Sequence, residues 1–213
     1  MGIGGLVLLW AAAAAAAGSA APPPVVVAFG DSITEGYGVE RGQDYPAQLE
    51  RALAAKGVRV KMVNAGVSGD TTNNALDRVA AVIAAKPSLV ILEFGGNDGL
   101  RGLPPAATRK NLSELIVRLQ KAGARVALVG MTLPKNYGSG YLTKFEATFT
   151  GLAAEHKVTL IDVRGAALQG GDVKGLMQAD GIHPTGAGYQ RLVTFLLPIA
   201  QKEIQAAARR GRK

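Results

Sequence analysis

The chain has no cysteine and few residues of several other reactive kinds. Its 213 residues include two histidines and one tryptophan, and aromatic residues make up only 5%. The absence of cysteine excludes disulfides, thiolate nucleophiles, thiolate-bound zinc and a lipid-modified cysteine. With so few histidines a metal centre would depend mainly on carboxylates, so we expect neither a metal nor another cofactor.

Acidic residues are outnumbered by basic ones, and the formal net charge is +8. Much of this excess lies in a basic tail over residues 209–213, which contains Arg209, Arg210, Arg212 and Lys213. The other cations are spread along helical segments without forming a basic block. We therefore expect no nucleic-acid partner and interpret the tail as a solvated terminus.

Charged residues are also absent from positions 1–21, an apolar stretch that ends in small residues before three prolines. This composition predicts a secretory signal peptide cleaved near Ala20 or Ala21, although no basic residues precede its apolar core. A retained membrane anchor is the alternative, but its alanines and glycines make it only weakly hydrophobic. We expect a periplasmic or secreted protein with no membrane span after cleavage.

After the prolines, apolar runs alternate with segments of helical period. The apolar runs are 25–29, 58–63, 89–94, 125–129 and 158–161, and the helical segments are 45–56, 72–86, 105–121, 144–156 and 185–208. Such alternation predicts βαβ units, and strands that are apolar throughout indicate a parallel sheet covered on both faces. We expect one α/β domain over residues 25–208 with a five-stranded parallel sheet, and we favour a monomer.

Polar and glycine-rich segments follow these apolar runs. They are GDSITEGYG (30–38), NAGVSGDTT (64–72), GGND (95–98), MTLPKNYGSGY (131–141) and, before the last helical segment, DGIHP (180–184). Because parallel strands end at one edge of a sheet, these segments are expected to meet in a crevice there. The chain has no nucleotide-binding glycine loop after its first strand, and the G-x-S-x-G nucleophile motif is absent too.

Ser32 and His183 are the candidate nucleophile and base. A serine needs a base to become nucleophilic, and histidine is the base this chain offers. Asp180 precedes His183 by three residues, a spacing that can orient the imidazole and leave its Nε2 to accept a proton from Ser32. Asp180 and Pro184 are also typical of a helix start. We interpret His156 as an ordinary helix-end histidine.

Acyl transfer also needs hydrogen-bond donors for the developing oxyanion. The backbone N–H of Ser32 can supply one. Gly66 or Gly69 can supply another, because a residue without Cβ allows close approach to its N–H. Asn97 can add its side-chain amide, although asparagine after two glycines is also a common turn residue.

Together the four blocks GDSITEGYG, SGDTT, GGND and DGIHP resemble the SGNH (GDSL) hydrolase family, and they occur in that family's order. The likeness is greatest to its bacterial arylesterase and multifunctional thioesterase I/lysophospholipase group. The resemblance implies a flavodoxin-like three-layer α/β/α fold with Ser32 as nucleophile, His183 as base and Asp180 orienting that base. It also implies an oxyanion hole formed by Ser32, Gly69 and Asn97.

The resemblance implies a serine esterase acting on acyl esters or thioesters of small molecules or lipids. The alternatives are a carbohydrate esterase that deacetylates polysaccharide and a non-catalytic binding module, which the intact set of site residues disfavours. The segment after the fourth apolar run contains Leu133, Tyr137 and Tyr141 beside one proline and two glycines. We expect it to form a loop that closes over an acyl chain and favours medium chains over acetyl.

Overall fold

The computed structural model describes residues 22–163 and 174–210. Their strands form one five-stranded sheet in the order β2-β1-β3-β4-β5, in which all neighbouring strands are parallel. The strands are β1 (Val25–Gly30), β2 (Lys61–Gly66), β3 (Leu89–Glu93), β4 (Arg125–Gly130) and β5 (Thr159–Asp162). This is the flavodoxin-like strand order, so the predicted α/β fold with a five-stranded parallel sheet is confirmed.

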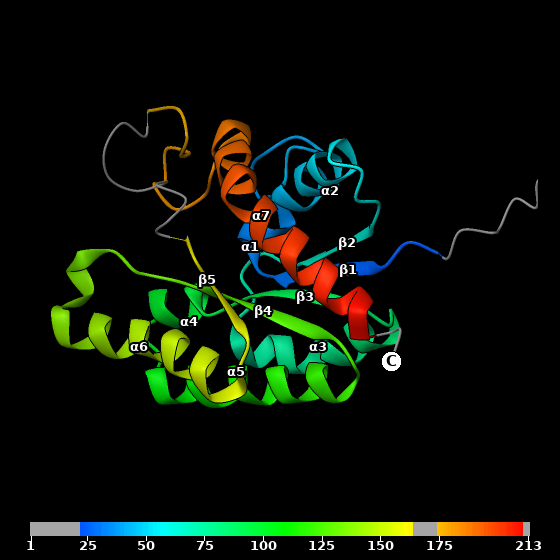
Figure 1. Ribbon diagram of the computed structural model, residues 1–213. Coiled ribbons are helices and arrows are strands. Elements are labelled where there is room, and N and C mark those ends of the chain that lie inside the picture. Colours follow the sequence, from blue (N-terminus) through cyan, green and yellow to red (C-terminus); the bar gives the residue numbers. More distant parts are fainter. Residues whose placement is uncertain (1–21, 164–173, 211–213) are drawn as a thin grey trace, which may run out of the picture.

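Helices cover both faces of the sheet. They are α1 (Ser32–Glu35), α2 (Tyr45–Ala55), α3 (Thr72–Ala84), α4 (Gly96–Leu100), α5 (Pro105–Lys121), α6 (Ser139–His156) and α7 (Gly186–Arg210), with a short 3₁₀ turn η1 (Lys135–Tyr137). Figure 1 shows α2 and α7 on one face and α3, α5 and α6 on the other. The molecule therefore has the three layers expected from the sequence.

Alternate residues of the central strands pack into two separate cores. In β3, Val90 and Leu92 pack with the α3, α5 and α6 side chains, whereas Leu89 and Ile91 pack with those of α2 and α7. Since side chains alternate along a strand, Glu93 points to the same face as Ile91. The order of connections reverses between β1 and β3, and this fold binds ligands at that switch point, beyond the carboxyl ends of the strands.

Strand β2 starts and ends three residues later than predicted. It is a half-exposed edge strand, and its register pairs Lys61 with Val25 and Gly66 with Gly30. The apolar residues Val58 and Val60 precede the strand and pack with the α2–α7 core instead. An edge strand needs fewer apolar residues, so its ends are poorly marked in the sequence.

Two helices also differ from their predicted limits. Helix α6 begins at Ser139 instead of residue 144, which places Gly140 and Tyr141 in a helix and not in a loop. Helix α7 continues to Arg210, so the first two residues of the predicted tail, Arg209 and Arg210, are helical. The one-turn helices α1 and α4 are too short for a periodic pattern to predict.

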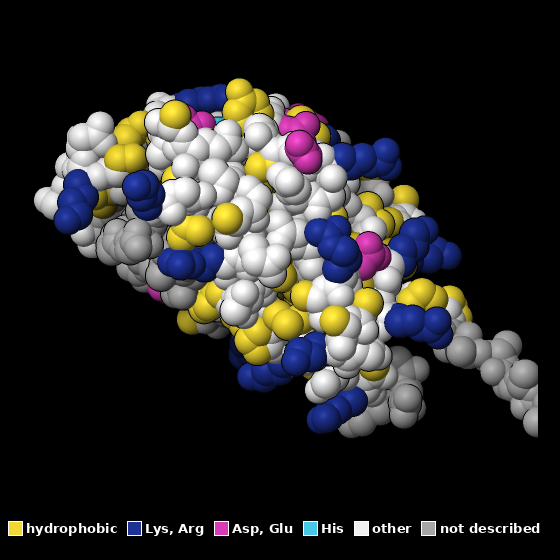
Figure 2. Space-filling view, turned by 90° about the horizontal axis from the view of Figure 1, so that it is seen from above, with side chains coloured by type: hydrophobic (Ala, Val, Ile, Leu, Met, Phe, Trp, Pro, Cys, Tyr) yellow, Lys and Arg dark blue, Asp and Glu magenta, His cyan; other side chains and the backbone are white. Residues whose placement is uncertain are grey.

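Two predicted terminal features fall outside the described residues. These are the signal peptide over residues 1–21 and the last three residues of the basic tail, 211–213. In the part that the structure describes, no helix combines the length and apolar character needed to cross a bilayer. Figure 2, which looks onto the α2–α7 side, shows lysine and arginine side chains in separate groups.

Candidate active site

Ser32 is held at the carboxyl edge of the sheet by the turn that joins β1 to α1. It is the first residue of α1, and the preceding Asp31 caps this helix by accepting the N–H of Ile33 on Oδ1 at 3.1 Å. Gly36 ends the helix after one turn in a left-handed conformation, with φ 90°. This cap and the short helix fix the position of the Ser32 hydroxyl.

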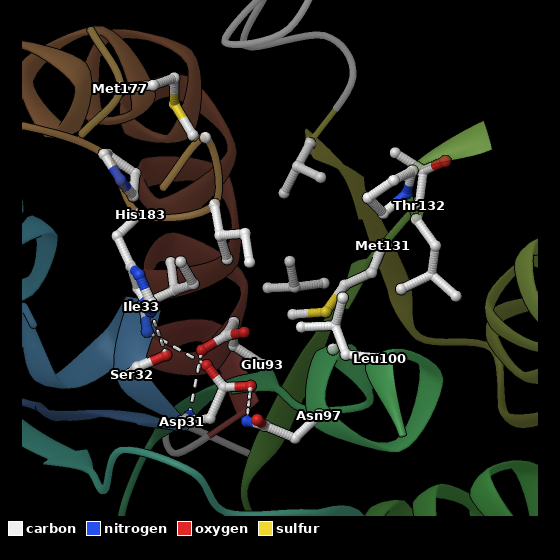
Figure 3. Close-up of a pocket in the computed structure, with 18 of the residues that line it drawn as sticks. Asp31, Ser32, Ile33, Glu93, Asn97, Leu100, Met131, Thr132, Met177 and His183 are labelled. Atoms are coloured by element: carbon white, nitrogen blue, oxygen red, sulfur yellow. Dashed lines mark hydrogen bonds between the residues drawn. The ribbon is translucent and has the colours of Figure 1, made fainter. Parts of the chain in front are cut away.

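Ser32, His183 and Asp180 form a continuous hydrogen-bonded chain, of which Figure 3 labels Ser32 and His183. His183 Nε2 lies 2.8 Å from Ser32 Oγ, and His183 Nδ1 lies 2.7 Å from Asp180 Oδ2. Asp180 Oδ1 also accepts the N–H groups of Ile182 and His183, at 2.9 and 3.0 Å. Hydrogen bonds from the His183 ring and from these two backbone groups lower the pKa of Asp180 to about 2.

Two residues that the sequence did not reveal support His183. The ring of Tyr37 lies against its imidazole, with centroids 4.7 Å apart. The Gln178 amide nitrogen donates to the carbonyl oxygens of Tyr37 and Pro184, at 2.8 and 3.0 Å. Gln178 N–H donates to the His183 carbonyl at 2.8 Å. The turn that carries His183 is thus tied to the end of α1.

Asn97 lies in α4, directly after β3, and its amide faces the same edge. Its Nδ2 donates to Asp31 Oδ2 at 3.1 Å and to the Asp70 carbonyl at 3.0 Å. The neighbouring Asp98 is buried and accepts the N–H of Thr72 at 2.9 Å, which ties α4 to the start of α3. The amide position is therefore fixed by contacts with two other segments.

The structure distinguishes Gly66 from Gly69, the two glycines of segment 64–72 that could supply an oxyanion donor. Gly69 lines the cavity beside Ser32 and has a left-handed backbone with φ 82°. Gly66 is the last residue of β2 and is not among the residues that line this cavity. A Cβ on Gly66 would lie 2.1 Å from the backbone nitrogen of Glu35, so glycine is required there for the packing of α1.

Asp31 and Glu93 form a buried carboxyl pair beneath the serine. Glu93 Oε2 accepts the backbone N–H of Asp31 at 3.2 Å and the hydroxyl of Thr34 at 2.7 Å, and each acidic residue is 2% exposed. Burial raises the pKa of Asp31 from 3.8 to about 6. Burial and the Asp31 charge raise the pKa of Glu93 well above 4.5. A lone carboxylate in the apolar run 89–94 was the available sequence signal for this pair.

A cavity of about 1080 Å³ opens beside these residues. Ser32, Gly69, Asn97, His183 and Leu133 all contribute to its wall, so most of the residues predicted for the site are brought together. Among the described residues, no cluster of three or more histidine, aspartate or glutamate side chains is placed to hold a metal ion.

Tyr137 and Tyr141, which we expected to cover the substrate, are not among the residues that line the cavity. Their hydroxyls donate to the carbonyl oxygens of Leu100 and Leu103, at 2.8 and 2.7 Å. The two tyrosines therefore anchor η1 and the start of α6 to the end of α4 and the segment that follows it. Leu142, one residue beyond Tyr141, faces the cavity in their place.

Comparisons with known proteins agree with this geometry. The sequence profile of the GDSL-like lipase/acylhydrolase family matches residues 28–191. Esterase TesA of Pseudomonas aeruginosa is 42% identical over 171 residues, which are 79% of this chain and 84% of the esterase. Thioesterase 1/protease 1/lysophospholipase L1 of Escherichia coli K12 is 36% identical over 158 residues, 73% of each chain.

A solved structure extends the agreement to three dimensions. AlinE4, described as an SGNH-hydrolase family esterase, superposes with a TM-score of 0.71 at 40% identity, covering 86% of this chain and 98% of AlinE4. The resemblance inferred from the four sequence blocks is confirmed. The chain belongs to the GDSL-like lipase/acylhydrolase family and is a hydrolase that acts on esters.

Proposed function

We propose that the protein is a serine esterase in which Ser32 attacks the acyl carbonyl carbon, His183 is the general base and Asp180 orients the histidine. The observation that carries this proposal is the chain of contacts from Ser32 Oγ to His183 Nε2 at 2.8 Å and from Nδ1 to Asp180 at 2.7 Å. Its reactive end opens into a cavity with mostly apolar walls, where an acyl group can be held.

The contacts support one direction of proton transfer. When Nδ1 carries the hydrogen and donates it to Asp180, the lone pair of Nε2 faces the Ser32 hydroxyl and accepts its proton as the oxygen attacks. The low pKa of Asp180 keeps it ionised at neutral pH, where it stabilises the imidazolium that forms. His183 then protonates the departing alcohol or thiol, and a water molecule releases the acid from Ser32 by the same steps.

The oxyanion of the tetrahedral intermediate would receive hydrogen bonds from the backbone N–H groups of Ser32 and Gly69 and from the Asn97 amide. Both hydrogens of that amide already have acceptors, Asp31 Oδ2 and the Asp70 carbonyl. The oxyanion must therefore compete with one of them. This competition favours the charged intermediate over the neutral carbonyl of the substrate.

The cavity walls favour acyl esters or thioesters of small molecules or lipids over an acetylated polysaccharide. Apolar side chains from β3, β4, α4 and α7 face its interior, and they offer little to the hydroxyl groups of a sugar chain. The names of the two bacterial relatives, an esterase and a thioesterase/lysophospholipase, agree with this choice. We also propose export through the signal peptide predicted in residues 1–21.

Turnover of p-nitrophenyl acetate, butyrate and octanoate, of octanoyl-CoA and of acetylated xylan tests the proposal. We expect hydrolysis of the aryl esters and the thioester, and labelling of Ser32 by an organophosphate, located by mass spectrometry. The cavity also contains Ser68 and Ser139. Labelling of either in place of Ser32 would contradict the assigned nucleophile, and highest kcat/KM on acetylated xylan would establish the carbohydrate esterase.

A further inference from the structure

The candidate base and its carboxylate lie in one turn, residues 178–184, that is held together by its own hydrogen bonds. The backbone N–H of Gln178 donates to the His183 carbonyl at 2.8 Å and so closes the turn. The contacts between Asp180 and His183 also lie inside it, at 2.7 Å between the side chains and 3.0 Å to the backbone N–H. The geometry of the pair is therefore local. The distance from His183 to Ser32 depends on how the whole turn is held against α1.

The side chain of Gln178 connects this turn to the end of α1. Its amide nitrogen donates to the Tyr37 carbonyl at 2.8 Å and to the Pro184 carbonyl at 3.0 Å. The backbone N–H of Tyr37 donates in turn to the Ser32 carbonyl at 3.0 Å. Three hydrogen bonds thus lead from Ser32 to His183 by way of the Gln178 side chain. The contact between Ser32 Oγ and His183 Nε2, at 2.8 Å, closes this ring.

Gly38 allows the Gln178 amide to lie against the residues that follow α1. It has a left-handed backbone with φ 74°, and a Cβ there would lie 2.3 Å from Gln178 Oε1 and 2.8 Å from Nε2. Gly57 has the same φ of 74°, but a Cβ there would meet no atom within 4 Å. Both positions favour glycine for their backbone conformation. Only Gly38 also leaves room for the amide.

Gln178 does not line the cavity, whereas Tyr37 and His183 do. Both hydrogens of its amide are bonded to carbonyl oxygens, so they are not available to a substrate. An effect of Gln178 on the reaction would therefore act through the position of His183.

We propose that Gln178 is a positioning residue: its amide holds the turn of Asp180 and His183 against the end of α1 and so sets the distance from His183 Nε2 to Ser32 Oγ. This proposal rests on the proposed esterase function. Proton transfer between these two atoms requires hydrogen-bond contact, and a displacement of about 1 Å can lower the rate by about 10²-fold.

The direct test is Gln178→Met, which keeps the length of the side chain and removes both donors. kcat for p-nitrophenyl butyrate should fall by about 10- to 100-fold, while KM should change by less than about threefold, because the cavity wall is kept. The rate at which an organophosphate labels Ser32 should fall by a similar factor, since that reaction needs the same base. Urea denaturation verifies that the variant is folded.

Gln48→Met is the matched control for the loss of an amide. The Gln48 amide also donates to two carbonyl oxygens, those of Gln43 at 2.6 Å and Gly186 at 3.1 Å. Gly186 begins α7, so this variant weakens the hold on the helix that follows the histidine turn. None of these three residues lines the cavity. The variant should lose stability and keep kcat within about threefold of wild type.

Gly38→Ala tests the same contact without changing Gln178. The added methyl group should displace the amide and lower kcat by about tenfold or more, with little change in KM. Gly57→Ala imposes the same backbone strain where there is open space, so it should keep wild-type kcat.

The outcomes separate this inference from the proposed function. Wild-type kcat in folded Gln178→Met would overturn the inference, and so would equal losses of kcat in Gln178→Met and Gln48→Met. An increase in KM alone would overturn it too, because Gln178 would then act on substrate binding. If Gln178→Met does not fold, equal kcat in Gly38→Ala and Gly57→Ala overturns the inference. Failure of the wild type to hydrolyse any ester would instead overturn the proposed function.

Discussion

The molecule contains two serine–histidine pairs with the same contact distance but different surroundings. Ser32 Oγ and His183 Nε2 are 2.8 Å apart, and so are Ser113 Oγ and His156 Nε2 between α5 and the end of α6. Each histidine also has a carboxylate nearby. A search for short serine–histidine contacts would therefore find both pairs.

The carboxylate shows the difference between the pairs. Asp180 meets Nδ1 of His183, the nitrogen opposite the serine, whereas Glu155 approaches the Nε2 of His156 that already contacts Ser113, at 3.5 Å. In the second arrangement the carboxylate cannot orient the ring from the nitrogen opposite the serine. Neither Ser113 nor His156 lines the cavity. Serine–histidine contact thus indicates catalysis only with a carboxylate on the opposite nitrogen and space for a substrate.

Replacing the two serines should give the largest contrast. Ser32→Ala removes the nucleophile and should lower kcat for p-nitrophenyl butyrate by roughly three or more orders of magnitude, with the protein still folded. Ser113→Ala should keep wild-type kcat and lose about 1 kcal/mol of stability with its hydrogen bond. Steady-state kinetics measures kcat for each variant, and urea denaturation measures its free energy of unfolding. A comparable loss of kcat in Ser113→Ala would remove the distinction.

The histidines and their carboxylates extend the comparison. His183→Ala should abolish turnover, and His156→Ala should keep it. Asp180→Asn should retain more activity than His183→Ala, because the ring remains but loses the charge that orients it and stabilises its protonated form. Glu155→Gln is the matched control and should match wild type. If His183→Ala and His156→Ala lose activity equally, the assignment of the base is wrong.

The oxyanion donors have no counterpart at the Ser113 pair. Removing one of them should lower kcat somewhat less than removing the nucleophile or the base. Asn97→Ala should lower kcat by around 10²–10³-fold and change KM far less, since the donor acts mainly in the transition state. The truncation also leaves the buried Asp31 carboxyl without one donor. Circular dichroism should therefore verify folding. An increase in KM alone would make Asn97 a substrate-binding or structural residue.

The sequence predicts the sheet because β1, β3 and β4 are nearly continuous apolar runs, and it predicts Ser32, Asp180 and His183 because local motifs carry them. It misplaces β2, since a half-exposed edge strand needs few apolar residues. Gly140 also looks like a loop residue, yet it is helical, because tertiary packing of α6 outweighs its weak helix propensity.

Other features depend on contacts between distant segments. Gln178 supports the histidine turn through the carbonyl of Tyr37, 141 residues away in sequence. Tyr137 and Tyr141 donate to carbonyl groups at the end of α4 and just after it, which no local pattern indicates. Local sequence patterns point to candidate reactive groups, but they do not reveal contacts between distant segments.

The last contrast lies in the exposure of the acids near the two pairs. The Glu155 side chain is 50% exposed, whereas Asp31 and Glu93 are buried under Ser32. The pKa of Asp31 rises from 3.8 to about 6 on folding. Between these values the folded protein holds a proton that the unfolded chain has lost, so the free energy of unfolding decreases as pH rises from about 4 to about 6. Asp31 contributes at most roughly 3 kcal/mol to this decrease.

Urea denaturation followed by circular dichroism between pH 4 and pH 7 measures this dependence. Glu93 acts in the same direction as Asp31, because burial and the Asp31 charge raise its pKa too. Asp180 acts in the opposite direction, but its pKa of about 2 confines its effect to pH values below about 4. The double variant Asp31→Asn/Glu93→Gln should therefore show a nearly flat profile, while Glu155→Gln should keep the wild-type slope. A wild-type stability that rises from pH 4 to pH 6 would contradict this prediction, because the two acids would then be ionised in the folded protein.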